Sequence, residues 1–202
     1  MPRELYLRVK AAAASLGMPL GRVVTEALEL WLGVTADHRT AELKRQLLDR
    51  LSEAAERLED GLFTKIYRQV LAGRKRCIVA HDVLVKAVAH GDPACAVVVR
   101  DLVLGRAGVL TSCLSAAMAC DELVKRGLRG AAGSLAVVLP AEAVLPLDWK
   151  TLVRAAKEAE RLGLDLEPSV IVAQAKLYDI SVIISTNDTL DRAGVPRVDP
   201  AV

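Results

Sequence analysis

The segment that most constrains the fold is residues 170–200, VIVAQAKLYDISVIISTNDTLDRAGVPRVDP. Residues 169–178 keep one side apolar at helical spacing, which predicts a helix. Residues 180–184 then form a short run rich in β-branched side chains, which is typical of a strand buried on both faces of a parallel sheet. Thr186, Asn187 and Asp188 follow directly. Because open α/β sheets bind ligands at the carboxyl ends of their strands, Asp188 is predicted to lie at a binding edge.

Alternating strands and helices extend this pattern over residues 77–202. Short apolar runs predict two more buried strands at residues 77–80 and 108–111, and a further strand is expected at residues 135–139 or 144–147. The expected helices cover residues 82–90, 94–104, 115–126 and 149–162, and the glycine-rich residues 127–133 are expected to form a loop. This alternation predicts an α/β domain with a parallel sheet that is flanked by helices on both faces.

The helix, the buried strand and the Thr186-Asn187-Asp188 motif together resemble the closing part of PIN domains, the small metal-dependent nucleases that include VapC-type toxins. The resemblance spans nearly all of residues 77–202 and rests chiefly on the carboxy-terminal part. It implies three or four carboxylates at the carboxyl ends of the strands, holding Mg²⁺ or Mn²⁺ that activates water against a phosphodiester. A hard divalent ion needs oxygen ligands and negative charge, so the acidic residues at this edge decide whether the site works.

The PIN pattern, carried over position by position, places apolar residues at most of the metal positions. Ala80 stands at the end of the first strand, Met118 in the helix after the second strand, and Pro168 at the start of the helix that precedes the last motif. Asp188 alone is acidic. An alternative ligand set uses acidic residues close to these positions, namely Asp82, Asp121 or Glu122, Glu167 and Asp188.

Two functions follow from this comparison. The preferred hypothesis is a PIN-like domain with a degenerate metal site and no cofactor, acting as an oligomeric nucleic-acid-associated or regulatory protein. The alternative is an active Mg²⁺- or Mn²⁺-dependent ribonuclease of the toxin–antitoxin kind. A third hypothesis, a purely structural oligomerisation protein, would bind no RNA or DNA. His81, beside the expected cleft, is either a phosphate- or base-binding residue or a surface or capping histidine, and Asp188 is either a ligand or a turn cap.

The amino-terminal residues 1–36 predict a helical hairpin. Apolar residues at helical spacing mark helices at residues 2–16 and 20–32, separated by Gly17-Met18-Pro19. The pair resembles the two helices of ribbon-helix-helix proteins of the CopG kind, which read DNA with a strand before the first helix. Only Met1 precedes Pro2, so that strand is missing. A rival register makes Leu5, Leu7 and Val9 one side of a strand.

Residues 37–76 predict a long amphipathic helical segment that serves as a linker or oligomerisation element. Its apolar residues recur every three or four positions, and Asp60-Gly61 is expected to bend or break it. The apolar stripe needs a partner, either a second copy of the chain or the carboxy-terminal domain. Arg74, Lys75 and Arg76 close the segment as a solvated linker or as a nucleic-acid-binding patch.

Composition limits the class of protein without identifying it. The apolar fraction of 52% can build a core, and with only 3% aromatic residues Ala, Val and Leu must fill it. No apolar run reaches the length of a membrane span and no signal segment opens the chain, so a cytoplasmic protein is expected. Residues 1–76 carry more basic than acidic side chains and the remainder carries the reverse, which weakly favours the amino-terminal part as the side that meets a polyanion. The four cysteines are expected to be small buried hydrophobes, and the scarcity of Asn and Gln favours a thermophilic source or a GC-rich genome.

Overall fold

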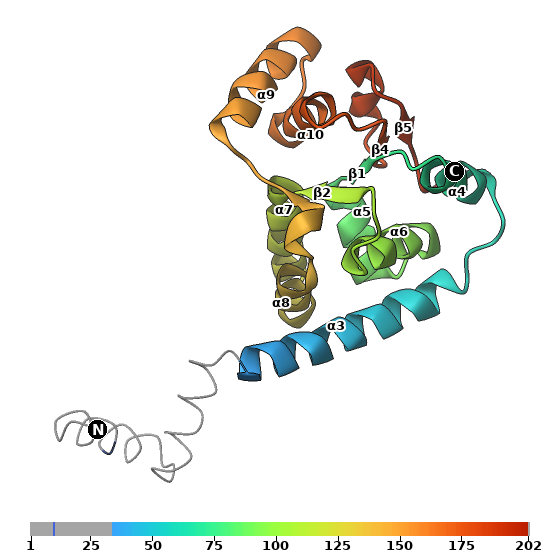
Figure 1. The fold of residues 1–202 in the computed structure, drawn as a ribbon, viewed down its shortest axis with the longest axis vertical. Coiled ribbons are helices and arrows are strands. Elements are labelled where there is room, and N and C mark those ends of the chain that lie inside the picture. Colours follow the sequence, from blue (N-terminus) through green and yellow to red (C-terminus); the bar gives the residue numbers. More distant parts are fainter. Residues whose placement is uncertain (1–9, 11–33, 202) are drawn as a thin grey trace. The chain divides into compact units, whose positions relative to one another are not determined.

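The computed structural model describes residues 10 and 34–201, so the predicted hairpin of residues 1–36 lies outside the described residues apart from residues 10 and 34–36. Contacts divide the chain after Leu43, and the unit Lys44–Val202 is described here by itself. This unit contains a five-stranded, wholly parallel sheet in the order β3-β2-β1-β4-β5, flanked by helices (Figure 1). The α/β class and the parallel sheet predicted from the sequence are therefore confirmed.

The strands are short, and the helices that connect them are longer. The strands are β1 (Cys77–Val79), β2 (Val109–Ser112), β3 (Val144–Leu145), β4 (Val182–Ile184) and β5 (Arg197–Val198). The helices are α3 (Val34–Ala55), α4 (Leu62–Ala72), α5 (His81–Val85), α6 (Pro93–Val103), α7 (Cys113–Lys125), α8 (Arg129–Val138), α9 (Trp149–Leu162) and α10 (Leu166–Leu177). Short π and 3₁₀ segments add η1 (Lys86–His90), η2 (Ala141–Ala143) and η3 (Asp188–Ala193).

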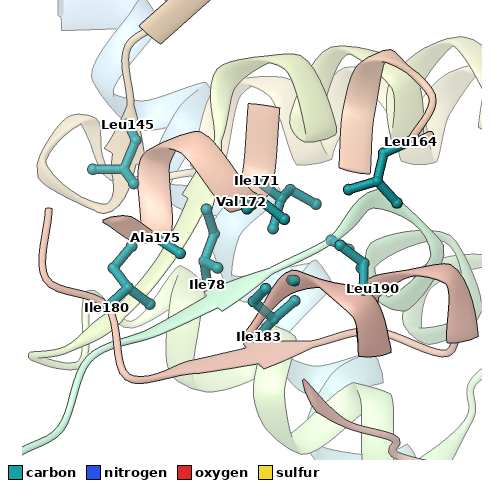
Figure 2. Packing of buried hydrophobic residues seen from close by; sticks show 11 residues of the cluster. Ile78, Leu145, Leu164, Ile171, Val172, Ala175, Ile180, Ile183 and Leu190 are labelled. Carbon is teal, nitrogen blue, oxygen red and sulfur yellow. The ribbon is translucent and has the colours of Figure 1, made fainter. Parts of the chain in front are cut away.

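The core forms where α10 packs on the central strands. Ile78 of β1 lies opposite Ile183 of β4 in the parallel register, and both belong to one buried cluster with Ile171 and Val172 of α10 (Figure 2). In Figure 1, α9 and α10 are drawn on one side of the sheet, and α5 and α6 on the other. Since β1 and β4 are buried on both faces, their continuous apolar sequence has the pattern expected of parallel strands.

The amphipathic segment before the sheet is two helices with different apolar faces. Leu51 of α3 is fully buried, as the predicted stripe requires, but Leu62, in the same stripe, is exposed. The helix is interrupted between Ala55 and Leu62. As a result, the buried face of α4 is formed by Phe63 and Tyr67 and not by Leu62. The apolar side of residues 47–70 is therefore covered largely within its own chain. Among the described helices, none combines the length and apolar character needed to cross a membrane.

Three expectations about residues 127–202 need correction. Residues 135–139 do not supply the third strand, because Leu135 and Val138 face the core from helix α8; the strand lies at β3, within the other predicted range. The glycine-rich loop is also shorter than expected, since α8 begins at Arg129. The edge strand β5 was not predicted; it pairs with β4 over only two residues, and Arg197 interrupts its apolar pattern.

Candidate functional site

The carboxyl ends of β1, β2 and β4 bring together segments that are far apart in the sequence. His81 and Asp82 follow β1, Ser115 lies in the first turn of α7 after β2, and Thr186 follows β4. The first turn of α10 adds Glu167. This is the edge at which open α/β sheets bind ligands, and it holds most of the acidic residues singled out in the sequence.

Glu167 is a buried carboxylate held by groups from two other elements. Its Oε1 accepts hydrogen bonds from Ser115 Oγ at 2.7 Å and from the backbone N–H of His81 at 3.1 Å. The ring atom Nδ1 of His81 lies 3.1 Å from the same oxygen. Nδ1 is close enough for an ion pair but is not aligned for a good hydrogen bond, and it is buried without any other partner in the described chain. Two hydrogen-bond donors and one ion-pair partner, from α5 and α7, thus converge on one oxygen.

The pKa values of His81 and Glu167 shift in the directions of an ion pair. The close contact of the ring with Glu167 and the negative charge of that carboxylate raise the pKa of His81 above its ordinary value of 6.5, against the opposing effect of burial. Burial alone would raise the pKa of Glu167, but His81 and Ser115 outweigh it, so its pKa lies below the ordinary value of 4.5. Both shifts favour the charged form of the pair, an imidazolium beside a carboxylate.

A chain of alternating charges runs from this pair toward the surface. Nε2 of His81 lies 3.9 Å from Oε2 of Glu122. Arg126 donates from Nε to Oε1 of Glu122 at 3.1 Å, and its Nη1 donates to Nε2 of His90 at 2.7 Å. Because arginine has no acceptor, that nitrogen of His90 must be the unprotonated one. Glu122 of α7 and Arg126, directly after this helix, therefore connect the pair formed by His81 and Glu167 to the partly exposed surface.

Asp82 ties the end of β1 to the end of β4. Its carboxylate accepts hydrogen bonds from the backbone N–H and from Oγ1 of Thr186, the latter at 2.6 Å. Ser185 Oγ donates to the same carboxylate at 3.1 and 3.2 Å. Lys86 Nζ in turn donates to Thr186 Oγ1 at 3.1 Å. Asp82 thus acts as a clamp between two neighbouring strands.

The remaining candidates do not join these groups. Asp121 points to solvent and pairs with Lys125 one turn along α7. Asp188 opens η3 and is exposed, and its side chain makes no hydrogen bond or ion pair within the described chain. Across residues 34–201 there is no group of three His, Cys, Asp or Glu side chains that could hold a metal ion.

The described side chains fit a divalent cation poorly. The two acidic side chains deepest in this edge, Asp82 and Glu167, accept hydrogen bonds from backbone and hydroxyl groups, and Glu167 already faces the ring of His81. Ala80 and Pro168, at two positions where the PIN resemblance calls for ligands, are buried and offer no oxygen in their side chains. A hard ion would have to displace the hydrogen-bond donors of Asp82 and Glu167 before it could bind their carboxylate oxygens.

The Ser115, Glu167 and His81 constellation is also unsuited to nucleophilic catalysis. Ser115 Oγ donates to Glu167 rather than to a nitrogen of His81, and the residue is fully buried. A serine nucleophile needs its hydroxyl on the general base and open to substrate. His81 itself retains 25% side-chain exposure, so it is the member of this group that solvent reaches.

The basic residues singled out in the sequence lie at the opposite edge of the sheet. Arg74, Lys75 and Arg76 are exposed and directly precede β1, at the amino end of the strand. Nη1 of Arg76 donates to the backbone carbonyl of Tyr178 at 3.0 Å, which holds this segment against the end of α10. The basic run therefore does not border the carboxyl-edge site.

Sequence reasoning located the acidic residues but missed their partners. Ser115 was not a candidate, and His81 was only a weak one. The usable signal was the position of His81, immediately after the strand-end residue Ala80, where the side chain must face the carboxyl edge of the sheet.

Comparison with known proteins adds little to this description. No family model and no curated protein matches the chain. Among solved structures, the crystal structure of PAE2754 from Pyrobaculum aerophilum is similar, with 16% sequence identity and a TM-score of 0.48. The match covers 63% of this chain and 92% of that one.

Proposed function

We propose that this chain is a PIN-like protein with a degenerate metal site, which acts in the cytoplasm as an oligomeric nucleic-acid-associated or regulatory protein. The observation that carries the proposal is the pairing of Glu167 with His81 at 3.1 Å. At the edge where PIN nucleases are expected to gather carboxylates around a cation, this chain places the imidazole of His81 against its buried carboxylate.

The charge balance of the edge supports a role without a metal. A buried carboxylate needs a compensating charge, and His81 supplies it from within the chain. Lys86, half-buried beside Thr186, adds a second cation at the same edge. A phosphate group that approaches this edge would meet His81 and Lys86, so association with a nucleic-acid backbone is compatible with the site even though hydrolysis is not.

The oligomeric part of the proposal has separate support. Trp149 at the start of α9 and Leu166 at the start of α10 are large apolar side chains that are 77% and 63% exposed. Exposed aromatic residues are enriched at interfaces between proteins. Since α3 and α4 cover much of their apolar stripe within the chain, these residues and the predicted hairpin of residues 1–36 are the places where a second copy would dock.

The competing function is a Mg²⁺- or Mn²⁺-dependent ribonuclease, and Asp188 is the observation in its favour, because it is acidic, exposed and unpaired within the described residues. A cleavage assay on a fluorescent single-stranded RNA with Mn²⁺, Mg²⁺ or EDTA separates the two functions. We expect no metal-dependent cleavage by the wild type. Cleavage that requires Mn²⁺, is lost in Asp188→Ala and persists in Asp49→Ala, which removes an exposed carboxylate of α3 outside the candidate ligand set, would overturn the proposal.

Nucleic-acid association needs its own test. A mobility-shift assay with the same RNA and with a DNA duplex, repeated at increasing salt, should show binding that weakens as salt rises. Lys86→Gln should weaken the binding, and Lys125→Gln, which removes an exposed lysine paired with Asp121, should change it less. If no binding is seen at low salt, the protein belongs to the purely structural class instead.

A further inference from the structure

A cavity lies away from the carboxyl edge and is lined by residues from the end of α3, from helix α4 and from helix α6, all within the unit that begins at Lys44. Figure 1 shows where these helices lie. The cavity measures about 500 Å³, within the usual range of small-molecule sites. Its apolar wall comes from Leu58, Phe63, Tyr67, Leu71 and Val97. The rings of Phe63 and Tyr67 are stacked, with centroids 5.7 Å apart and planes inclined by 8°.

Most charges around this cavity are neutralised within the chain. Asp101, which is buried, accepts hydrogen bonds from Tyr67 Oη at 3.0 Å and from Arg106 Nη1 at 3.1 Å. Arg68 pairs with Asp60 at 3.1 Å. These contacts hold the polar side chains of the wall in place, and the charged groups that make them are already paired within the chain.

Arg100 is the exception among the cations of the cavity wall. It is half-buried in the last turn of α6 and makes no side-chain hydrogen bond or ion pair with any described residue. Glu56, the acidic counterpart on the wall, is exposed at the rim. A guanidinium that borders an apolar wall and has no anionic partner among the described residues is available to pair with a carboxylate, sulfonate or phosphate group of a ligand.

We infer that this cavity binds a small amphipathic organic anion, with the anionic group on Arg100 and an aromatic or aliphatic body on the Phe63 and Tyr67 side. The combination of an apolar wall with one unpaired cation selects this ligand class over neutral or cationic molecules. The site is independent of the carboxyl-edge site and of the function proposed for it.

The test uses two fluorescent probes of nearly the same shape, 1-anilinonaphthalene-8-sulfonate, which carries a negative charge, and N-phenyl-1-naphthylamine, which is neutral. The wild type should bind the sulfonate saturably and with one-to-one stoichiometry. Arg100→Gln should weaken sulfonate binding by about tenfold, the effect of losing one charge-assisted hydrogen bond. It should leave binding of the neutral probe nearly unchanged.

Three further variants make the experiment decisive. Arg129→Gln removes an exposed arginine on α8, outside the cavity, and should have no effect. Glu56→Gln removes a negative charge at the rim that repels the sulfonate, so this variant should bind the sulfonate more strongly. Val97→Trp should fill the cavity and weaken the binding of both probes. Equal sulfonate affinity in the wild type and Arg100→Gln, with helical circular dichroism unchanged, or no saturable binding by the wild type, would overturn the inference.

Discussion

Replacing Glu167 with glutamine tests the ion pair on which the proposed function rests. The substitution preserves the shape of the side chain but removes its charge. If Glu167 is held by His81 and Ser115 as described, Glu167→Gln must destabilise the protein. If the residue instead belonged to a cluster of mutually repelling carboxylates waiting for a cation, the same change would relieve repulsion and stabilise it.

The size of the effect follows from the contacts of Oε1. A hydrogen bond to a charged acceptor contributes about 1.5–3 kcal/mol and one to a neutral acceptor about 0.5–1.5 kcal/mol, so each bond that the glutamine oxygen still accepts is weakened by about 1 kcal/mol. Two such bonds come from Ser115 and the backbone of His81. The lost ion pair adds little more, because His81 is 25% exposed and can release its proton. The expected loss near pH 6 is about 2–3 kcal/mol.

Urea unfolding followed by circular dichroism at 222 nm measures this loss, because the described chain is largely helical. The matched control is Asp121→Asn, which removes an exposed carboxylate of α7 and should change stability by at most about 0.5 kcal/mol. Because the ion pair contributes little beside the two hydrogen bonds, the difference between the wild type and Glu167→Gln should shrink only slightly as pH rises and His81 becomes neutral. A Glu167→Gln variant as stable as the wild type, or more stable, at every pH would refute the ion pair.

Three further outcomes are expected. Asp82→Ala should cost about 2–4 kcal/mol in urea unfolding, because it leaves the buried Ser185 hydroxyl and a backbone N–H without an acceptor; a near-neutral change would disprove the clamp. The raised pKa of His81 means that its stabilising effect is complete below pH 6.5 and is lost as pH rises through the folded-state pKa. The free energy of unfolding of the wild type should therefore fall over that pH window, and that of His81→Gln should fall less. Parallel plots of unfolding free energy against pH for the two proteins would contradict this. Leu51→Ala should cost about 2–5 kcal/mol and Leu62→Ala at most about 0.5 kcal/mol, and similar losses would mean that the break between α3 and α4 does not rotate the apolar face.

The central strands could be predicted because burial on both faces leaves a direct mark in the sequence. Residues 182–184 are all β-branched, and the observed strand β4 lies within the predicted range. Strand β5 leaves no such mark, because it is two residues long and one of them is Arg197. Helix α8 was hidden for a different reason: Gly130 and Gly133 suggested a loop, but tertiary packing of Leu135 and Val138 outweighs their low helix propensity.

The site was only partly predictable. The position of Asp82 and Glu167 near the carboxyl edge followed from the order of strands and helices. Their partners did not, because Glu167 and His81 lie 86 residues apart and nothing in a single sequence marks two such residues as a pair. The same residues that suggest a ligand set are, in the folded chain, bound to neighbouring side chains and backbone.

The strand order has a consequence for a chain that emerges residue by residue from the ribosome. Among the five strands of the described sheet, β1 is synthesised first, and it lies in the middle of the sheet between β2 and β4. Until residues 182–184 leave the exit tunnel, one edge of β1 has no hydrogen-bonding neighbour, and the apolar side chains that later face α10 remain uncovered. The sheet is therefore complete only after β4, about a hundred residues later than β1, has been synthesised, and a ribosome that stalls before this point would leave an aggregation-prone intermediate with exposed apolar surface.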